Sequence, residues 1–590
     1  MIRLLLFFAM PLLAQTARDP RHIENGFEIP HEFYADQPYV VITNDGKWLC
    51  VLTTGSGKEG APEQHVVSTI SADHGRTWSP LTDIEPSNGP EASWVMPLKV
   101  PSGRVYVFYN YNRDNIRLLP HTKNPVFARR VDTMGVYAFK YSDDNGHTWS
   151  KDRYEIPMRK TRLDRDNPDG GSIMYFWGVG KPILTPLFAM FGFAKVGKWD
   201  SPGGMVESQG CFLRSDNILT ERDPRKLVWQ LLPDGDECLH GPKGPVNDEV
   251  NPAVLSDGSL YATYRTIDGY NGQAYSRDGG HTWTPPAYAT YGPGGRLIKH
   301  NRAANFVRRF SNGNYLLWYH NHGGEQFHLK NMNHYLGRNP SWLSGGVEKD
   351  GHIYWSEPEI VLYNDDPAVG SSYPDFIEEN GRYFITETQK TIARVHEVAP
   401  ALLNALWTQH ENRTVTRKGV VLDLKPTPDS ATPMPKLGAS FTIDFWIKVR
   451  ELSAGQSILD TRDAKGKGIA LLTSDRSTIK LVMNDGTRKF EWDSDSGTQT
   501  GTMKVNTWQH VAVIVDGGPR IVSFVVDGVF NDGGPLRDYG WGRFPKELGD
   551  INAGDAKLAS KLYGEVARLR VYDRYLLTSE AVGNWRAGRQ

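Results

Sequence analysis

The segment SADHGRTW at residues 71–78 follows the pattern S-x-D-x-G-x-T-W, and the chain repeats this pattern at 142–149 and 276–283. In such a segment the Ser and Asp side chains can bond to the backbone of a tight turn, and the Gly can take the positive φ that the turn needs. The Trp then packs under the hairpin. Three complete copies are too many for chance, so the segment marks a repeated structural unit.

The spacing of the copies predicts a β-propeller. The first two begin 71 residues apart and the last two 134 apart, which leaves room for one degenerate copy between them. Residues 215–229 fit that copy loosely, and residues 350–355 form another weak one. A four-stranded blade with its loops takes about 70 residues. We therefore expect an all-β fold with a six-bladed propeller over residues 18–405, its last blade closed by the N-terminal strand.

The repeated segment is the Asp-box of the sialidase superfamily, whose members are β-propellers with BNR repeats, and the chain resembles that superfamily. The resemblance implies that the box aspartates, Asp73, Asp144 and Asp278, are structural. In the family they lie on outer turns, away from the site. It also implies a glycosidase as the first functional hypothesis.

Composition limits the alternatives. The chain has 590 residues, which predicts at least two domains, and 39% are hydrophobic, which is enough for a packed core. Lys plus Arg number 67 and Asp plus Glu 68, so a broadly basic surface for nucleic acid or anionic membranes is not expected. The three cysteines, Cys50, Cys211 and Cys238, are far apart, and we expect no disulfide framework or zinc site.

The N-terminus reads as a signal peptide over residues 1–17. A basic start is followed by about ten apolar residues and then by small ones. The apolar run is too short to span a bilayer, and no other segment has 18 consecutive apolar residues. The sequence therefore predicts a secreted or periplasmic protein without a membrane span.

A second domain is expected after a polar linker at 406–417. Residues 441–448 alternate as a strand does, and the phrases at 506–513, 525–528 and 564–572 resemble the laminin-G/concanavalin-A-like jelly roll. The fold predicted for 418–590 is thus a β-sandwich. Sugar binding and a spacer role are equally compatible with it. No cofactor is predicted. Many such domains bind calcium, so calcium in the jelly roll stays an open alternative, although no carboxylates here have a convincing calcium-ligand spacing.

Two residues on one hairpin match catalytic positions of the family. Glu249 opens a strand, an Asp-Gly turn follows at 257–258, and Arg265 ends the next strand. The hairpin brings its two ends together, so both side chains can share one mouth of the propeller. In the family the Glu activates the nucleophile and the Arg grips the substrate carboxylate. The alternative is a surface salt bridge across the hairpin.

Tyr373 stands where the family has its nucleophilic Tyr, just before a strand and an Asn-Gly turn. A neutral Tyr suits a sugar whose anomeric carbon carries a carboxylate, because an anionic nucleophile would be repelled. Arg338 resembles a further arginine of the carboxylate-binding triad. A guanidinium pairs with a carboxylate through two hydrogen bonds, which a lysine cannot do.

Two positions depart from the family pattern. Asp36 stands where the first triad arginine is expected, which weakens the case for sialic acid as the substrate. An Asp there would repel a carboxylate and could instead hold a sugar hydroxyl. The loop that carries the family's acid/base Asp has no Asp here, so Glu63 or Glu59 would have to serve, and Glu63 is our choice.

Other polar and aromatic residues suit a carbohydrate site. Arg302, His320 and Trp177 lie in segments rich in His, Asn, Arg and aromatics. Aromatic rings stack on sugar faces, and polar tips bond to hydroxyls. Because His320 and His322 alternate along a strand, at most one of them faces the site.

Three functions follow from these patterns. The first is an exo-glycosidase that hydrolyses a terminal, acidic sugar with retention, using Tyr373 as nucleophile, Glu249 as its base and Glu63 as acid/base. The second is a propeller polysaccharide lyase acting on uronic-acid glycans. The third is a glycan-binding protein without catalysis. The partner in each case is a glycan, and the oligomeric state stays open.

Overall fold

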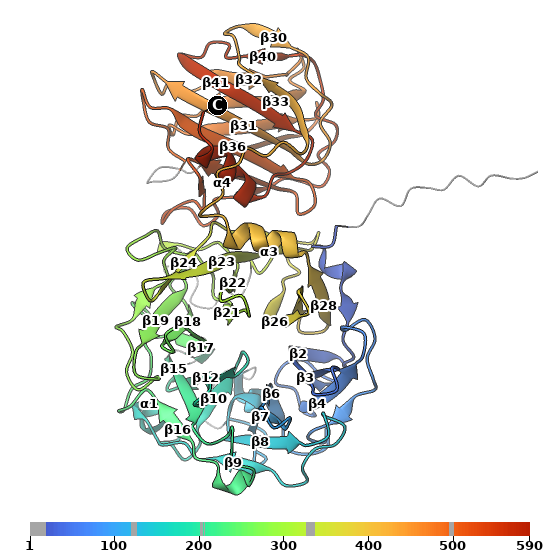
Figure 1. The fold of residues 1–590 in the computed structure, drawn as a ribbon, viewed down its shortest axis with the longest axis vertical. Helices are drawn as coiled ribbons and strands as arrows, with labels where there is room; N and C mark the ends of the chain where they lie inside the picture. The colour runs from blue at the N-terminus through green and yellow to red at the C-terminus, as the bar shows by residue number, and fades with distance from the viewer. Residues whose placement is uncertain are drawn as a thin grey trace, which may run out of the picture.

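The computed structural model describes residues 19–119, 127–200, 204–205, 207–325, 337–494 and 501–589. The signal peptide predicted at 1–17 lies outside the described residues. Figure 1 shows two bodies, a ring of sheets below and a sandwich above, with helix α3 (Pro400–Trp407) where they meet. Among the described helices, none is long and apolar enough to cross a membrane.

The N-terminal body is a propeller of antiparallel sheets that follow one another along the chain. The first sheet has the order β2 (Tyr34–Ile42), β3 (Trp48–Gly55), β4 (His65–Ser71), β5 (Thr82–Asp83). The second has β6 (Ala92–Lys99), β7 (Val105–Tyr111), β8 (Val136–Ser142), β9 (Tyr154–Ile156). The third has β10 (Tyr175–Gly178), β12 (Ala189–Val196), β15 (Ser208–Ser215), β16 (Gln230–Leu232), with β11 (Ile183–Leu184) beside β12.

The ring continues through three more sheets in the described residues. The fourth has β17 (Asn247–Val254), β18 (Leu260–Thr266), β19 (Gly272–Ser276), β20 (Ala287–Tyr288). The fifth has β21 (Phe306–Arg309), β22 (Tyr315–Tyr319), β23 (Ser341–Lys349), β24 (His352–Trp355), with β25 (Glu359–Leu362) beside β23. The sixth has β26 (Ser372–Glu379), β27 (Arg382–Thr388), β28 (Ala393–Val398), β1 (Phe27–Glu28).

The last sheet confirms the predicted closure by the N-terminal strand. Phe27 pairs with Val395 and Glu28 with Arg394, so the two ends of the propeller sequence share one sheet. The innermost strands β2 and β26 also contact each other. A small pair, β13 (Trp199–Asp200) and β14 (Gly204–Met205), and helix α1 (Arg162–Asp166) lie on the connections of the third sheet. Short 3-10 turns cover Ile23–Asn25, Phe127–Arg129, Val131–Thr133 and Pro224–Lys226.

The Asp-box turns have the predicted chemistry. Asp73 accepts hydrogen bonds from the backbone N–H and the hydroxyl of Thr77, at 2.8 and 2.7 Å, and Ser71 donates to it at 2.9 Å. Gly75 has φ 78°. Because β4 runs from His65 at one end of the sheet to Ser71 at the other, the box lies at the end opposite to Asp36. The same bonds recur at the other two copies.

The degenerate copy replaces the box aspartate with an asparagine. Ser215 donates to Asn217 Oδ1 at 3.2 Å, and the Val228 N–H donates to the same oxygen at 2.9 Å. An amide oxygen accepts as a carboxylate oxygen does, which explains why the turn survives without Asp.

The C-terminal body is the predicted sandwich. One sheet has the order β29 (Val420–Leu424), β41 (Gly564–Tyr572), β31 (Phe441–Val449), β36 (Gln509–Asp516), β37 (Ile521–Val526), β38 (Val529–Phe530), with β39 (Gly542–Arg543) on β37. The other has β30 (Ser430–Thr432), β40 (Ala556–Leu558), β32 (Ser457–Asp460), β33 (Gly468–Thr473), β34 (Ile479–Asn484), β35 (Lys489–Asp493). Alternate residues of β31, Phe441, Ile443 and Phe445, are buried in the core between the sheets.

The two bodies pack closely. Arg21 forms an ion pair with Asp516 at 2.6 Å, and the N–H of Ser579, in helix α4 (Thr578–Arg586), donates to Glu359 at 2.9 Å. Within the predicted linker, Gln409 is buried and donates to Ser579 Oγ at 2.9 Å. An apolar layer that includes Trp342, Phe530 and Trp541 fills the contact.

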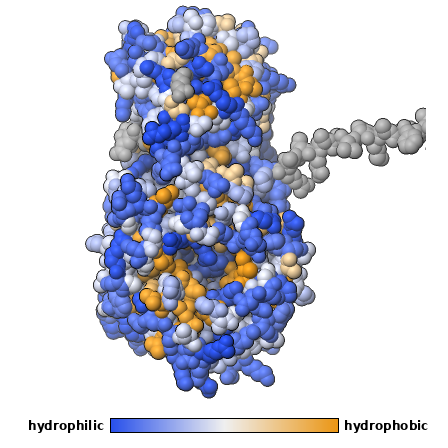
Figure 2. Space-filling model, in the orientation of Figure 1, coloured by the Kyte–Doolittle hydropathy of each residue, from blue (hydrophilic) through white to orange (hydrophobic). Residues whose placement is uncertain are grey.

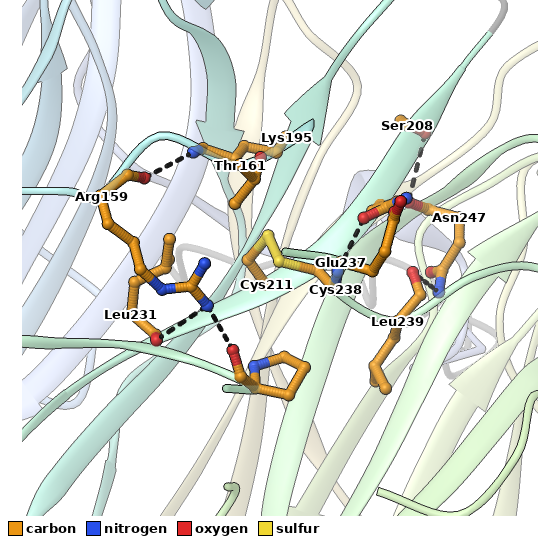
Figure 3. The surroundings of a disulfide bond; sticks show 12 residues. Arg159, Thr161, Lys195, Ser208, Cys211, Leu231, Glu237, Cys238, Leu239 and Asn247 are labelled. Atoms are coloured by element: carbon orange, nitrogen blue, oxygen red, sulfur yellow. Dashed lines mark hydrogen bonds between the residues drawn. A yellow bond between two sulfur atoms is a disulfide. The ribbon is translucent and has the colours of Figure 1, made fainter. Parts of the chain in front are cut away.

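The expectation that no disulfide forms was wrong. Cys211, in β15, is bonded to Cys238, which lies 27 residues later in the sequence (Figure 3). Spacing along the chain gave no hint, because the pairing depends on the Cα–Cα distance, which the sheet brings to 5.2 Å. Cys50 is a buried free thiol.

Candidate active site at the mouth of the propeller

Four innermost strands carry the same irregularity near their first residues. The pairing register shifts in β2, β6, β17 and β26, and the residue at each shift has a positive φ: Gln37 (55°), Trp94 (62°), Glu249 (49°) and Tyr373 (48°). Positive φ is uncommon for residues other than Gly and often marks a functional site. We call this end of the propeller the mouth. Two predicted catalytic residues lie on these bulges.

Tyr373 and Glu249 form a buried pair at the mouth. The phenol hydroxyl donates a hydrogen bond to Glu249 Oε1 at 2.9 Å, and both residues are at most 4% exposed. Burial raises the pKa of Glu249, although Arg265 opposes the rise. Burial and the charge of Glu249 raise the pKa of Tyr373. The tyrosine is therefore protonated at neutral pH, and its hydroxyl proton is directed at Glu249. The raised pKa of Glu249 increases the affinity of its carboxylate for that proton.

Arg265 reaches the same carboxylate from the other strand of the hairpin. Its Nη1 lies 2.9 Å from Glu249 Oε1, and its Nε and Nη2 pair with Asp248, the latter at 3.0 Å. Arg265 is 4% exposed, so this is a buried ion pair and not a surface bridge. Trp177, from the third sheet, donates its indole N–H to Glu249 Oε1 at 3.4 Å.

Arg338 contacts the residue that precedes the tyrosine. Its Nη1 donates to Ser372 Oγ at 2.8 Å, and its Nη2 lies 3.4 Å from the carbonyl of Arg302. Arg302 is itself 2% exposed. The charge of Arg338 lowers the pKa of both Glu249 and Tyr373, although burial outweighs it in each case. The structure thus brings Arg265 and Arg338 to one region, where the backbone carbonyl of Arg302 also lies.

His320 lies beside this region as a neutral ring. It stacks on His300 with 5.8 Å between ring centroids, and burial lowers the pKa of both, that of His300 to about 3. Among the described residues, His320 Nε2 has no hydrogen-bond partner, and neither has Glu249 Oε2. A bound ligand would satisfy such buried polar atoms. His322 stacks on Tyr539 of the jelly roll. The expected strand alternation does not apply to these two histidines, because β22 ends at Tyr319.

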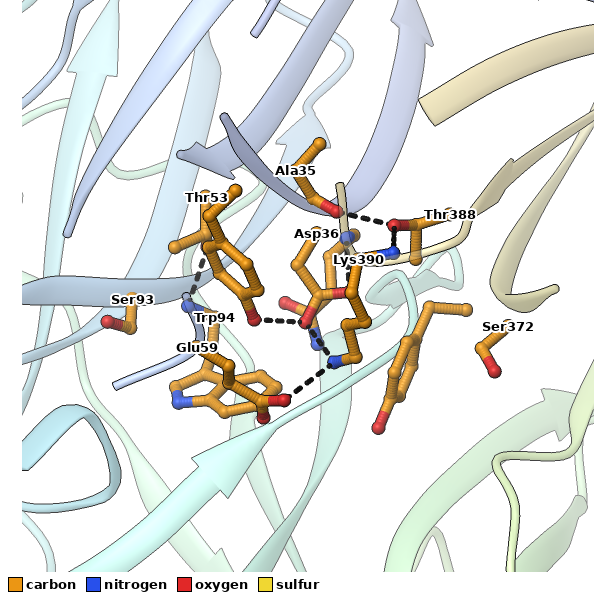
Figure 4. A network of polar contacts seen from close by, with 12 residues as sticks. Ala35, Asp36, Thr53, Glu59, Ser93, Trp94, Ser372, Thr388 and Lys390 are labelled. Atoms are coloured by element: carbon orange, nitrogen blue, oxygen red, sulfur yellow. Dashed lines mark hydrogen bonds and ion pairs between the residues drawn. The ribbon is translucent and has the colours of Figure 1, made fainter. Parts of the chain in front are cut away.

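A charged network of Asp36, Glu59 and Lys390 lies beside the ring of Tyr373 (Figure 4). Lys390 Nζ is 2.7 Å from Asp36 Oδ2 and 3.5 Å from Glu59 Oε2. The same ammonium lies 4.4 Å from the centroid of the Tyr373 ring. Tyr34 donates its hydroxyl to Asp36 at 2.8 Å. Although burial opposes it, the charges of Asp36 and Glu59 raise the pKa of Lys390.

This network changes the interpretation of Asp36. Its carboxylate is fully buried and paired with a cation, so it does not present a bare negative charge to a substrate. The positive group that the sequence lacks at this position is supplied by Lys390, 354 residues later.

The structure separates the two candidate glutamates. Glu59 contacts Lys390 and lies 3.0 Å from Arg130. Although burial opposes it, Lys390, Arg130 and Arg338 lower the pKa of Glu59 to about 2. Glu63 accepts a hydrogen bond from Ser56 at 2.7 Å and has no described contact with Tyr373 or Lys390.

The opposite end of the propeller is hollow but carries a different set of residues. A cavity of about 770 Å³ is lined by the ends of the innermost strands, including 40–42, 97–99 and 252–254. Asp375 there is paired with Lys181 at 2.8 Å. Figure 2 shows the propeller with a central depression flanked by hydrophobic residues. In the described parts of the chain, no group of three or more His, Cys, Asp or Glu side chains suits a metal ion.

Lys390 was not among the predicted site residues, although the sequence carries a signal for it. Strand β26 leaves the mouth and β27 returns to it, so the turn after Thr388 must lie at the mouth. Lys390 is the only cationic residue of the turn 389–392. Following strand direction, rather than motif matching, would have identified it.

Comparison with known proteins agrees with this architecture. Residues 126–385 match the family model described as a BNR repeat-like domain, and residues 427–582 match that of the concanavalin A-like lectin/glucanases superfamily. A sialidase of Clostridium perfringens is 24% identical over 266 residues, which cover 42% of this chain and 59% of the relative. The chain thus spans about three fifths of that relative's length.

Solved structures with similar folds include two that differ in coverage. Trypanosoma rangeli sialidase has a TM-score of 0.42 and 13% identity, covering 94% of this chain and 93% of its own. A protein of unknown function from Dyadobacter fermentans has a TM-score of 0.46 and 15% identity, covering 63% of this chain and 97% of its own. The two family models and the Asp-box turns support a sialidase-like propeller fold followed by a C-terminal jelly roll.

Proposed function

We propose that the protein is a retaining exo-glycosidase that removes a terminal acidic sugar from a glycan, with Tyr373 as nucleophile and Glu249 as its base. The observation that carries the proposal is the buried hydrogen bond from the Tyr373 hydroxyl to Glu249 at 2.9 Å. A nucleophile within hydrogen-bond reach of a base, which a third group orients, is the arrangement that covalent catalysis needs. Arg265 is that third group.

In the first step Glu249 takes the phenol proton while the Tyr373 oxygen forms a bond to the anomeric carbon, the bond to the leaving oxygen breaks, and the leaving oxygen takes a proton from water. The elevated pKa of Glu249 favours the proton transfer. The Lys390 ammonium, 4.4 Å from the ring centroid, stabilises the negative charge that develops on the phenol. Glu249 is paired with Arg265, so its own charge is partly offset before the substrate enters.

In the second step water attacks the anomeric carbon, the bond from that carbon to the Tyr373 oxygen breaks, and the phenolate takes back the proton that Glu249 held. Glu59 is ionised and lies in the charged network at the mouth, so it suits the base that activates this water better than Glu63 does. Glu59 therefore replaces Glu63 as our choice for the base of this step only. An ionised Glu59 has no proton to give, so the leaving oxygen of the first step takes its proton from water.

The cations at the mouth favour an acidic substrate. Arg265 pairs with the base Glu249, Arg338 contacts Ser372 beside Tyr373, and Lys390 lies on the Tyr373 ring. Guanidinium groups recognise carboxylates through paired hydrogen bonds. Trp177 and His320 add a polar and aromatic wall that suits a sugar.

We further propose that the protein is exported. The N-terminal sequence supports this, and so does the disulfide between Cys211 and Cys238, because disulfides persist in oxidising compartments.

The test is turnover of para-nitrophenyl glycosides of acidic sugars, sialic acid and hexuronic acids included. Tyr373→Phe and Glu249→Gln should each lower kcat by roughly 10²- to 10⁴-fold. The matched controls Tyr563→Phe and Glu547→Gln, both in the jelly roll, should leave it unchanged. A product with the ultraviolet absorbance of an unsaturated uronide would instead establish a lyase. Glycan binding without turnover of any substrate would establish a binding protein.

A further inference from the structure

One loop of the jelly roll, residues 531–541 between β38 and β39, contacts the propeller close to the mouth. Lys299 is 1% exposed, and its ammonium donates to the backbone carbonyls of Asp532, at 2.7 Å, Gly534, at 3.0 Å, and Arg537. Arg296 forms an ion pair with Asp532 as well. A buried ammonium held by carbonyls of another domain fixes the two domains in one arrangement.

The same loop binds the chain that follows β22. The Gly323 N–H donates to the Asp538 carbonyl at 3.0 Å, and the Glu325 N–H to the Pro535 carbonyl at 3.0 Å. The Trp541 indole N–H donates to the Asn321 carbonyl at 3.1 Å. Residues 321–325 therefore owe their main-chain hydrogen bonds largely to the jelly roll.

Both neighbours of Arg338 are held in the same way. His322 stacks on Tyr539 with 4.6 Å between centroids, and its Nε2 lies 2.7 Å from the carbonyl of Gly337. Arg543, in β39, donates to the carbonyl of Asn339 at 3.1 Å and to its Oδ1 at 3.3 Å. The backbone on each side of Arg338 is thus tied to the second domain.

Arg338 passes this constraint to the nucleophile. Its guanidinium donates to Ser372 Oγ at 2.8 Å, and Ser372 directly precedes Tyr373 on the bulge of β26. A continuous set of contacts runs from the jelly roll through Arg338 to the reacting side chain. Displacements near 1 Å at such positions cost about 10²-fold in rate or binding.

We infer that the jelly roll is a positioning element of the propeller's site, and that Arg543 and Tyr539 set the place of Arg338. This role, the positioning of Arg338, differs from both sugar binding and a spacer function. The inference rests on the proposed function, because its kinetic readout is turnover of an acidic sugar.

The test uses the full chain and the variant Arg543→Ala. Its matched control is Arg462→Ala, which removes an arginine paired with Asp460 on the β32–β33 turn of the jelly roll, away from the propeller (Figure 1). Arg543→Ala should raise KM for the para-nitrophenyl glycoside roughly tenfold, since it weakens carboxylate binding. It should lower kcat by a smaller factor, since Arg338 also contacts Ser372 beside the nucleophile. Arg462→Ala should leave KM as it is.

A double-variant comparison separates positioning from a general loss of structure. In an Arg338→Ala background, Arg543→Ala should raise KM no further, because the group it positions is absent. An equal rise in both backgrounds would overturn the inference. If Arg543→Ala does not fold, Tyr539→Leu, which removes the ring stacked on His322, makes the same comparison.

A second readout does not depend on activity. Amide hydrogen exchange at residues 337–339 should quicken in Arg543→Ala and stay unchanged in Arg462→Ala. If the wild type turns over no acidic glycoside, the proposed function fails while this readout still decides the inference. If the wild type is active and neither KM nor exchange responds to Arg543→Ala, the inference alone fails.

Discussion

Replacing Lys390 with methionine tests the charged network directly. The change keeps the length of the side chain and removes its charge, leaving the carboxylate of Asp36 fully buried without a counter-ion. Breaking a buried ion pair by removing one partner costs about 3–5 kcal/mol. The cost should be lower here, about 2–3 kcal/mol. Lys390 is 28% exposed, and Asp36 keeps hydrogen bonds from the Tyr34 hydroxyl and the Gln37 N–H.

The assay is urea unfolding of four proteins, the wild type, Lys390→Met, Asp36→Asn and the double variant, followed by tryptophan fluorescence. Lys390→Met should lower the unfolding midpoint with an unchanged slope. The double variant should recover most of the loss, because an uncharged pair leaves no buried charge unpaired. If the double variant loses as much free energy of unfolding as the two single variants together, the ion pair between Lys390 and Asp36 is refuted.

The same variants have a defined pH dependence. Burial raises the pKa of Asp36, and Lys390 opposes that rise. Without Lys390 the pKa of Asp36 rises further, and a carboxyl whose pKa is raised by folding loses stability as the pH rises through that value. The penalty of Lys390→Met should therefore be full at neutral pH and smaller at about pH 4, close to the ordinary pKa of Asp. A penalty that grows in acid would contradict this reasoning.

Three further predictions concern other parts of the chain. Burial raises the pKa of Glu249, and the base must be ionised, so the acid limb of the kcat/KM pH profile should lie above the usual pKa range of Glu. The charge of Asp248 adds to this rise in pKa, so Asp248→Asn should move the acid limb to lower pH. Replacing both Cys211 and Cys238 with Ser should cost about 3–4 kcal/mol for a loop of 27 residues, and the wild type should lose a similar amount on reduction, measured by urea unfolding. Asp278→Ala removes hydrogen bonds to one turn and should lower the melting temperature while KM and kcat stay unchanged, as expected for a residue away from the mouth.

Much of the fold could be predicted because its signals are local. Each Asp-box closes its own turn through bonds within eight residues, so the repeat alone reveals the hairpins and their spacing reveals the propeller. The pairing of Glu249 with Arg265 is likewise set by a single hairpin. The disulfide and the contacts of the jelly roll depend on segments 27 to more than 200 residues apart, which only the folded chain brings together.

Lys390 is the residue for which sequence matching alone led to the opposite conclusion. A motif comparison places Asp36 opposite an arginine and infers a negative site, whereas the folded pair of Asp36 with Lys390 is neutral and its cation lies on the ring of Tyr373. Compared with the family pattern, this protein therefore keeps a positive group at this place in the mouth but uses the ammonium of Lys390 instead of a guanidinium. An arginine offers a planar fork that holds a carboxylate through two parallel bonds, but an ammonium is a compact charge without that directional demand. Lys390 is also held by Glu59. It should therefore fix the orientation of an acidic sugar less strictly than the arginines Arg265 and Arg338 do. Replacing it in Lys390→Arg should narrow the range of acidic glycosides that the protein turns over.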